Sequence, residues 1–172
     1  TAVKPGSNPN FYFQDIDSDV FSGVYVYDNS IDPELGDELL LTVEVEEYYG
    51  LTELTNSVSS VVLSSGNYLE PTYITTADLA EGCSFNAEQY EGMLVNVENI
   101  TVMSLPNEYG EWTVDDGSGG CIIDDYFFDG DMESYEVGST LASLTGVVNY
   151  AYGGYRILPR NSDDINVDDG GC

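Results

Sequence analysis

Residues 38–54 read Glu-Leu-Leu-Leu-Thr-Val-Glu-Val-Glu-Glu-Tyr-Tyr-Gly-Leu-Thr-Glu-Leu, and their pattern indicates the fold class. Every second position of its first half is apolar, namely Leu39, Leu41, Val43 and Val45. A period of two residues is typical of a β-strand that has one buried and one wet face. The stretch therefore predicts a sheet whose acidic side chains lie on the outside.

An internal repeat extends this prediction along the chain. At an offset of about 100 residues, five ordered blocks match: 1–3 with 101–103, 12–15 with 112–115, 23–26 with 120–123, 35–39 with 137–141, and 45–54 with 148–157. Each block has the pattern of a strand between turn residues. Within residues 92–102 the apolar phase shifts between Val97 and Ile100, which predicts a β-bulge in a curved strand.

We therefore expect an all-β protein of two tandem, small OB-like or Greek-key β-barrel units. The first unit covers residues 1–80, and the second covers residues 81–172 and ends in an acidic tail. Residues 76–80 predict a capped turn or short helix between them. The first unit lacks most of its first strand, because Thr1 is the counterpart of Thr101 whereas the second unit's strand begins at Gly92.

A barrel that lacks a strand leaves unpaired backbone groups and apolar interior for another β-segment to cover. Three segments could fill the gap: sequence upstream of Thr1, the chain's own end at 164–168, or a strand of a neighbouring copy. We favour the third, because head-to-tail strand donation builds filaments. The candidate donor residues are Thr1, Ala2, Val3, Ile165 and Val167.

The composition disfavours several partners. A net charge of −29, from three basic and 32 acidic residues, opposes binding to nucleic acid. The 42% of apolar residues and the 14 tyrosines are enough for a folded core. No apolar stretch is long enough for a membrane span, and no export signal opens the chain, so we expect any such signal to have been removed.

The three cysteines, Cys83, Cys121 and Cys172, make a poor zinc or redox site because the chain has no histidine and no CxxC pair. A disulfide between Cys83 and Cys121 is the better interpretation, and it predicts an oxidising, extracellular compartment. Cys172 is left over. It has either a partner further downstream or a partner in another copy.

Two acidic loops are candidate calcium sites. The first holds Asp15, Asp17 and Asp19, and the second holds Asp124, Asp125, Asp129 and Asp131. Hard cations favour such carboxylates, although neither loop has the glycine and terminal glutamate of an EF-hand. Solvated acidic loops are the alternative. The many aromatic side chains predict core packing first, and a carbohydrate platform second, since sugar stacking needs no positive charge.

Catalysis is the least supported function. Without histidine, and with only Lys4, Arg156 and Arg160 as basic residues, the usual sets of base, nucleophile and oxyanion donor cannot be assembled. Pairs of carboxylates occur by chance among so many acidic residues. We therefore expect a protein that is not an enzyme.

Several motifs resemble the tandem OB-fold-like region of large bacterial secreted proteins, which often neighbours nuclease or lamin-tail-like domains. They are residues 11–15, 22–28, 47–54, 89–95, 110–116, 146–150 and 159–161, and they cover nearly the whole chain. The resemblance implies an OB-like fold and export. It implies no activity, because the nuclease chemistry of that family lies in other domains.

Two functions remain from the sequence. The first is an extracellular structural protein, a fibre, pilus-like or surface-matrix subunit that polymerises by strand donation between copies. The second is an accessory module of a larger secreted enzyme, such as an extracellular nuclease, that binds a carbohydrate or oligonucleotide or spaces domains. The missing strand and the odd cysteine favour the first, and the family resemblance favours the second.

Overall fold

The computed structural model of the 172-residue chain describes residues 2–3, 10–80, 86–128 and 132–167. In these ranges the chain is all-β, as predicted, and its only helices are short 3-10 turns: η1 (Thr76–Leu79), η2 (Ala87–Tyr90), η3 (Asp125–Phe127) and η4 (Ser162–Asp164). The turn predicted at residues 76–80 is η1. No helix in the described ranges is long and apolar enough to cross a membrane.

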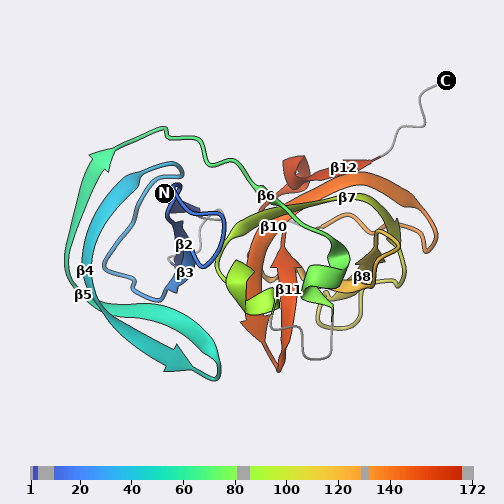
Figure 1. The fold of residues 1–172 in the computed structure, drawn as a ribbon, viewed down its shortest axis with the longest axis horizontal. Helices are drawn as coiled ribbons and strands as arrows, with labels where there is room; N and C mark the ends of the chain where they lie inside the picture. The colour runs from blue at the N-terminus through green and yellow to red at the C-terminus, as the bar shows by residue number, and fades with distance from the viewer. Residues whose placement is uncertain (1, 4–9, 81–85, 129–131, 168–172) are drawn as a thin grey trace.

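The second half of the chain forms a closed five-stranded barrel (Figure 1). Its strands are β7 (Leu94–Val102), β8 (Trp112–Asp115), β9 (Cys121–Ile123), β10 (Thr140–Ala151) and β11 (Gly154–Leu158). They pair in the order β7-β8-β9-β11-β10, and β10 pairs again with β7 to close the barrel. Two short strands, β6 (Thr72–Tyr73) and β12 (Ile165–Val167), extend this sheet. The closed barrel agrees with the OB-like fold that the sequence predicts.

The barrel closes because its strands present one apolar face to a common core. Val95, Val97 and Ile100 of β7 are fully buried, and Trp112 and Ile123 from β8 and β9 join them. The shift of apolar phase in β7 occurs at Asn99, whose φ of 53° lies in the left-handed region. This local irregularity lets both halves of the strand keep their apolar side chains inside the barrel.

The first part of the chain forms an open five-stranded sheet, which we call the first sheet. Its strands are β1 (Ala2–Val3), β2 (Phe11–Gln14), β3 (Gly23–Val26), β4 (Glu38–Tyr48) and β5 (Leu51–Ser64), in the order β1-β2-β3-β5-β4. β3 and β5 run parallel, as β9 and β11 do in the barrel. Phe11, Val26, Ile31 and Leu39 form its small buried core.

The first sheet packs against the barrel through an apolar junction. Tyr12 of β2 is buried together with Leu94, Phe127, Val147 and Leu158 of the barrel. At its edge, the backbone N–H of Leu94 donates to the side-chain carbonyl of Gln14 at 2.8 Å. Because a buried aromatic ring and a buried hydrogen bond both span this junction, it holds the two parts against each other.

Candidate functional site

Among the described residues, the first sheet has one long strand edge without a strand partner. In the barrel, β10 pairs with β7 along one edge and with β11 and β12 along the other. In the first sheet, β4 holds the same place in the strand order, and within the described residues it pairs with β5 alone. The edge that β7 covers on β10 therefore has no covering strand on β4, and we call it the open β4 edge.

The hairpins that contain β4 and β10 have the same register. Val45 pairs with Leu54 across the turn at Tyr49, and Val148 pairs with Ile157 across the turn at Tyr152. Val45 and Val148 thus lie at equivalent positions. Their exposure differs completely, since Val45 is 68% exposed and Val148 is 0% exposed.

The backbone just before β7 accounts for this difference. The N–H of Gly92 donates to the carbonyl of Val148 at 2.8 Å, and the N–H of Val148 donates to the carbonyl of Met93 at 2.9 Å. This pairing lays the start of the strand over the valine. The described part of the chain has no such segment beside Val45, so this valine faces solvent.

Exposure along β4 increases toward the hairpin tip. Leu39 is buried, Leu41 and Val43 are half-buried, and Val45 is exposed. The sequence predicted that a missing strand would uncover all four side chains. The structure limits the uncovered stretch to the second half of the strand, because Ile31 and Phe11 pack with Leu39 in the core of the first sheet.

The predicted donor segments already have partners in their own chain. Ala2 and Val3 form β1 and pair with Phe13 and Tyr12 of β2, and Thr1 lies outside the described residues. Ile165 to Val167 form β12, which pairs with the first half of β10. Ile165 is only 7% exposed and belongs to the barrel core. Donation by either segment would require it to leave these positions.

The candidate calcium residues do not converge where the structure describes them. Asp15, Asp17 and Asp19 are exposed, and the N–H of Asp17 donates to the Asp15 carboxylate. Asp124 is buried and Asp125 exposed, while Asp129 and Asp131 lie outside the described residues. In the described ranges, no three acidic or cysteine side chains meet in a group that could hold a metal ion.

Cys121 lies in the barrel core and has no disulfide partner among the residues that the structure describes. It is 2% exposed, and burial raises its pKa to about 12, so the thiol stays protonated at neutral pH. Cys83 and Cys172 lie outside the described residues. The disulfide between Cys83 and Cys121 therefore stays a prediction.

Arg156 lies at the centre of a buried ion cluster that was not predicted from the sequence. Its guanidinium Nη1 donates to Glu111 at 2.6 Å and to Asp124 at 3.1 Å, and Nη2 donates to the Ala151 carbonyl at 2.6 Å. The arginine side chain is 4% exposed. One feature of the sequence could have indicated this cluster. The chain has only three basic residues and 32 acidic ones, so a buried arginine has many carboxylates to pair with.

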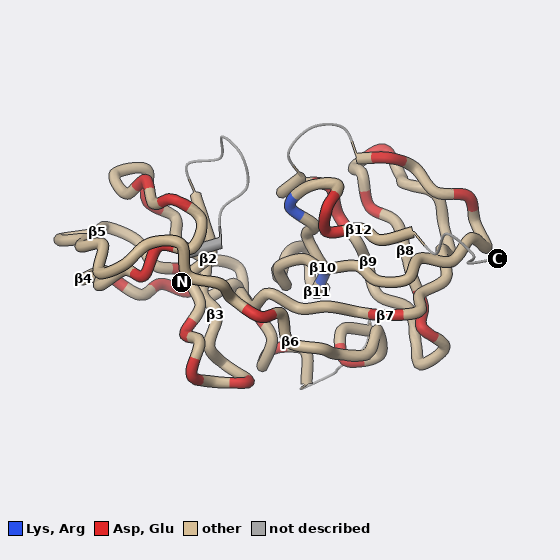
Figure 2. Tube along the Cα trace, turned by 90° about the horizontal axis from the view of Figure 1, so that it is seen from above, with Lys and Arg blue, Asp and Glu red and all other residues tan. Residues whose placement is uncertain are grey.

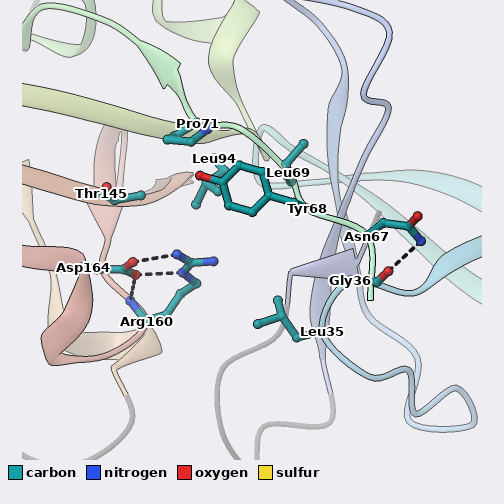
Figure 3. A pocket seen from close by; sticks show the side chains of 10 residues that line it. All are labelled: Leu35, Gly36, Asn67, Tyr68, Leu69, Pro71, Leu94, Thr145, Arg160 and Asp164. Atoms are coloured by element: carbon teal, nitrogen blue, oxygen red, sulfur yellow. Dashed lines mark hydrogen bonds and ion pairs between the residues drawn. The ribbon is translucent and has the colours of Figure 1, made fainter. Parts of the chain in front are cut away.

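A cavity of about 360 Å³ lies where residues 67–71 cross from the first sheet to the barrel (Figure 3). Leu35 and Asn67 line it from one side, and Leu94 and Arg160 line it from the other. Arg160 forms a two-pronged ion pair with Asp164, with Nε and Nη2 at 2.7 and 2.6 Å from the carboxylate oxygens. Its charge is therefore neutralised, which makes the cavity a poor site for an anion.

Acidic residues are distributed along both parts of the chain, whereas the described basic residues lie in the second half alone (Figure 2). Both of these arginines, Arg156 and Arg160, are held in ion pairs. The described surface therefore presents no basic patch to a polyanion.

One comparison with known proteins found a match, to a family model. A family model described as a domain of unknown function (DUF8508) matches residues 81–168, about half of the chain. The matched range contains all the barrel strands from β7 to β11 and also β12, and it leaves out the first sheet. No curated protein and no solved structure matches the chain.

Proposed function

This chain belongs to the DUF8508 family, and from its own geometry we propose that it is a non-enzymatic extracellular structural subunit that joins copies through β-strand addition at the open β4 edge. The proposal rests on the contrast between Val45 and Val148. The two valines have the same position in their hairpins, but Val45 is exposed and Val148 is buried. A fibre or surface matrix is the assembly that head-to-tail strand addition produces.

The two parts of the chain are interpreted as tandem copies of one barrel unit. Both have the same strand order and a parallel pair at the same place, and the hairpin residues 45–54 and 148–157 have identical registers. In the described residues, β4 of the first copy has no antiparallel neighbour that corresponds to residues 92–100 of the second. An extended segment in that place would complete it.

The incoming strand would run antiparallel to β4, as β7 runs antiparallel to β10. It would cover Val45 and the half-buried Val43 and Leu41, with apolar burial contributing roughly 25 cal/mol per Å². Each new backbone hydrogen bond would add about 0.5 to 1.5 kcal/mol. A segment of several residues thus gives enough stabilisation to link subunits, in the manner of known strand-addition complexes.

The occupant that we favour is an end segment of a neighbouring copy. Sequence upstream of Thr1 is the alternative occupant, and it would make the first sheet complete within one chain. The extracellular location rests on the predicted disulfide and on the resemblance to secreted proteins. Cys172 offers a second, covalent link between copies.

Light scattering coupled to size exclusion, followed by negative-stain microscopy, tests the proposal on the full chain. We expect concentration-dependent oligomers and filaments from the unmodified protein. The variant Val45→Asp should remain folded, because this side chain is already exposed, and should stay monomeric because its charge blocks the open β4 edge. Leu105→Asp is the matched control, since Leu105 is 60% exposed and follows β7 on the barrel.

A protein that remains monomeric at all concentrations and in added salt would contradict self-assembly and favour the accessory-module alternative. Filaments that form equally well with Val45→Asp would show assembly through another surface. Both outcomes remove the open β4 edge as the basis of the function.

A further inference from the structure

Two hairpin tips carry tyrosine where turn chemistry favours other residues. Tyr49 and Gly50 connect β4 to β5, with φ of 51° and 91°, and Tyr152 and Gly153 connect β10 to β11, with φ of 53° and 84°. Positive φ at both central positions defines a type I′ turn, whose first position favours asparagine, aspartate or glycine. A bulky residue with positive φ is an outlier, and here the same outlier occurs twice.

Packing does not explain these two tyrosines. Tyr49 is 87% exposed and Tyr152 is 98% exposed, so neither ring contributes to a core. Strained backbone conformations concentrate at functional positions, so an exposed residue that strains the backbone points to a function of its side chain in solvent. The two rings are therefore candidates for contact with a ligand.

The two tips lie side by side, at the same end of the molecule in Figure 1. A Cβ atom at Gly50 would lie 2.8 Å from Cε1 of Tyr150 on β10, so the first tip rests against the second hairpin. Tyr150 contacts Tyr155 with ring centroids 4.9 Å apart, and Tyr48 contacts Tyr49 at 4.7 Å. We call the group the tyrosine platform: Tyr48, Tyr49, Tyr150, Tyr152 and Tyr155.

Hydrogen-bonding groups surround the platform. Burial raises the pKa of Tyr155 to about 12, with smaller contributions from neighbouring carboxylates, of which Glu91 is the largest. Glu88 and Glu47 are also close enough to act on the same hydroxyl. The phenol of Tyr155 therefore stays a neutral donor beside carboxylate acceptors, an arrangement that can bond to several hydroxyl groups at once.

We propose that the tyrosine platform binds neutral carbohydrate, with tyrosine rings stacked on the C–H faces of sugar rings. The exposed rings supply amphipathic stacking surfaces, and the surrounding carboxylates and phenols match sugar hydroxyls. The tip residues of the platform, Tyr49 and Tyr152, are exposed on two hairpins, which suits a polymer chain rather than a small enclosed molecule.

Other ligand classes fit the platform less well. The net charge of −29 repels nucleic acid and acidic or sulfated glycans. A cation needs ring faces arranged around a common point. Within each tyrosine pair the ring centroids are only 4.7 or 4.9 Å apart, which leaves no space for a cation between the two rings. The ring of Tyr152 already has the Arg156 guanidinium at 5.6 Å.

Native gel electrophoresis with dissolved polysaccharide tests the proposal. The soluble neutral probes are xyloglucan, mixed-linkage β-glucan and galactomannan, and alginate is the acidic control. Binding to the insoluble polysaccharides cellulose and chitin is measured by co-sedimentation. We expect retardation or co-sedimentation by at least one neutral polysaccharide and none by alginate. The monomeric Val45→Asp variant should bind equally well, because Val45 is not among the five tyrosines of the platform or the carboxylates beside Tyr155.

The decisive variant is the double substitution Tyr49→Asn and Tyr152→Asn. Asparagine suits a type I′ turn, so we expect the melting temperature to rise by about 2 °C or more while the affinity for the polysaccharide falls at least about tenfold. Tyr109→Asn is the matched control, since Tyr109 is 72% exposed on another turn of the barrel, and it should bind like the unmodified protein.

Three results would overturn the proposal. They are the absence of binding to every neutral polysaccharide, binding to alginate, and unchanged affinity in the double variant. A double variant that loses affinity because it unfolds would reveal itself by a lowered melting temperature, which also contradicts the expected relief of turn strain.

Discussion

Replacement of Gly92 by alanine should break the contact between the first sheet and the barrel. Gly92 has a φ of 73°, and a Cβ atom there would lie 2.5 Å from the backbone N and 2.9 Å from the Cα of Val24. From the other side, a Cβ on Gly23 would meet the backbone of Gly92 and Met93. Two glycines thus let the backbones of β3 and of the segment before β7 approach each other.

Two terms contribute to the expected loss of stability. A positive φ costs an alanine about 1 kcal/mol relative to glycine. Pressing a methyl group against backbone that cannot move aside costs a further 1 to 3 kcal/mol or so, as in other overpacked interiors. We therefore expect Gly92→Ala to lower the free energy of unfolding by about 2 to 4 kcal/mol.

Matched glycines separate the two terms. Gly138 has a φ of 90° and no atom within 4 Å of a new Cβ, so Gly138→Ala should lose only the backbone term of about 1 kcal/mol. Gly154 has open space, and no positive φ is found there, so Gly154→Ala should be close to neutral. Urea unfolding followed by far-UV circular dichroism and by the fluorescence of the single tryptophan, Trp112, measures all three. A Gly92→Ala variant no less stable than Gly138→Ala would refute the close packing of the two parts.

Two further predictions concern buried charge. Arg156→Ala should lower the free energy of unfolding by about 3 kcal/mol, because it leaves the carboxylates of Asp124 and Glu111 without their partner. The double variant with Asp124→Asn should recover part of this loss, as measured by urea titration. Burial raises the pKa of Glu91, so the folded chain holds this proton more tightly than the unfolded chain. The resulting stabilisation is present at low pH and lost as the pH rises from the ordinary glutamate value of about 4.3 through the raised folded value. Glu91→Gln keeps an acceptor for the Thr52 N–H. In thermal melts over this pH range, the melting temperature of the variant should depend less on pH than that of the unmodified protein. An unchanged dependence would assign the effect to other carboxyl groups.

The hairpin of residues 45–54 was predictable because the repeat and the alternation agree there. Both hairpins have a Tyr-Gly turn and the same register. The sequence match of residues 12–15 with 112–115 differs by one residue from the match that the strand pairing shows. Tyr12 aligns with Trp112 in sequence, but Phe11 pairs with Val26 as Trp112 pairs with Ile123. Three consecutive aromatic residues at 11–13 carry no alternation, so the sequence could not say which face is inside.

The sequence also could not show that β12 belongs to the barrel. Its alternation is short, and the turn η4 separates it from β11. In the structure, Val167 pairs with Leu141 as Val62 of β5 pairs with Leu39 in the first sheet. The far half of β5 and the separate strand β12 thus occupy equivalent places. A linear alignment could not detect this equivalence, because β5 is one continuous strand whereas β11 and β12 are separate strands.

Charge favours one end of a neighbouring copy as the strand that would cover the open β4 edge. That edge carries Glu38, Glu44, Glu46 and Glu47, and burial raises the pKa of Glu53 in the adjacent strand, with Glu46 adding to the effect. A strand from residues 163–169 would bring four more aspartates to this surface, and like charges across a strand pair are destabilising. Residues 1–10 contain no acidic side chain and hold the one lysine, Lys4. Although Ala2 and Val3 must first leave β2, this segment is the electrostatically favoured donor, because it adds no negative charge to a strand edge already rich in it.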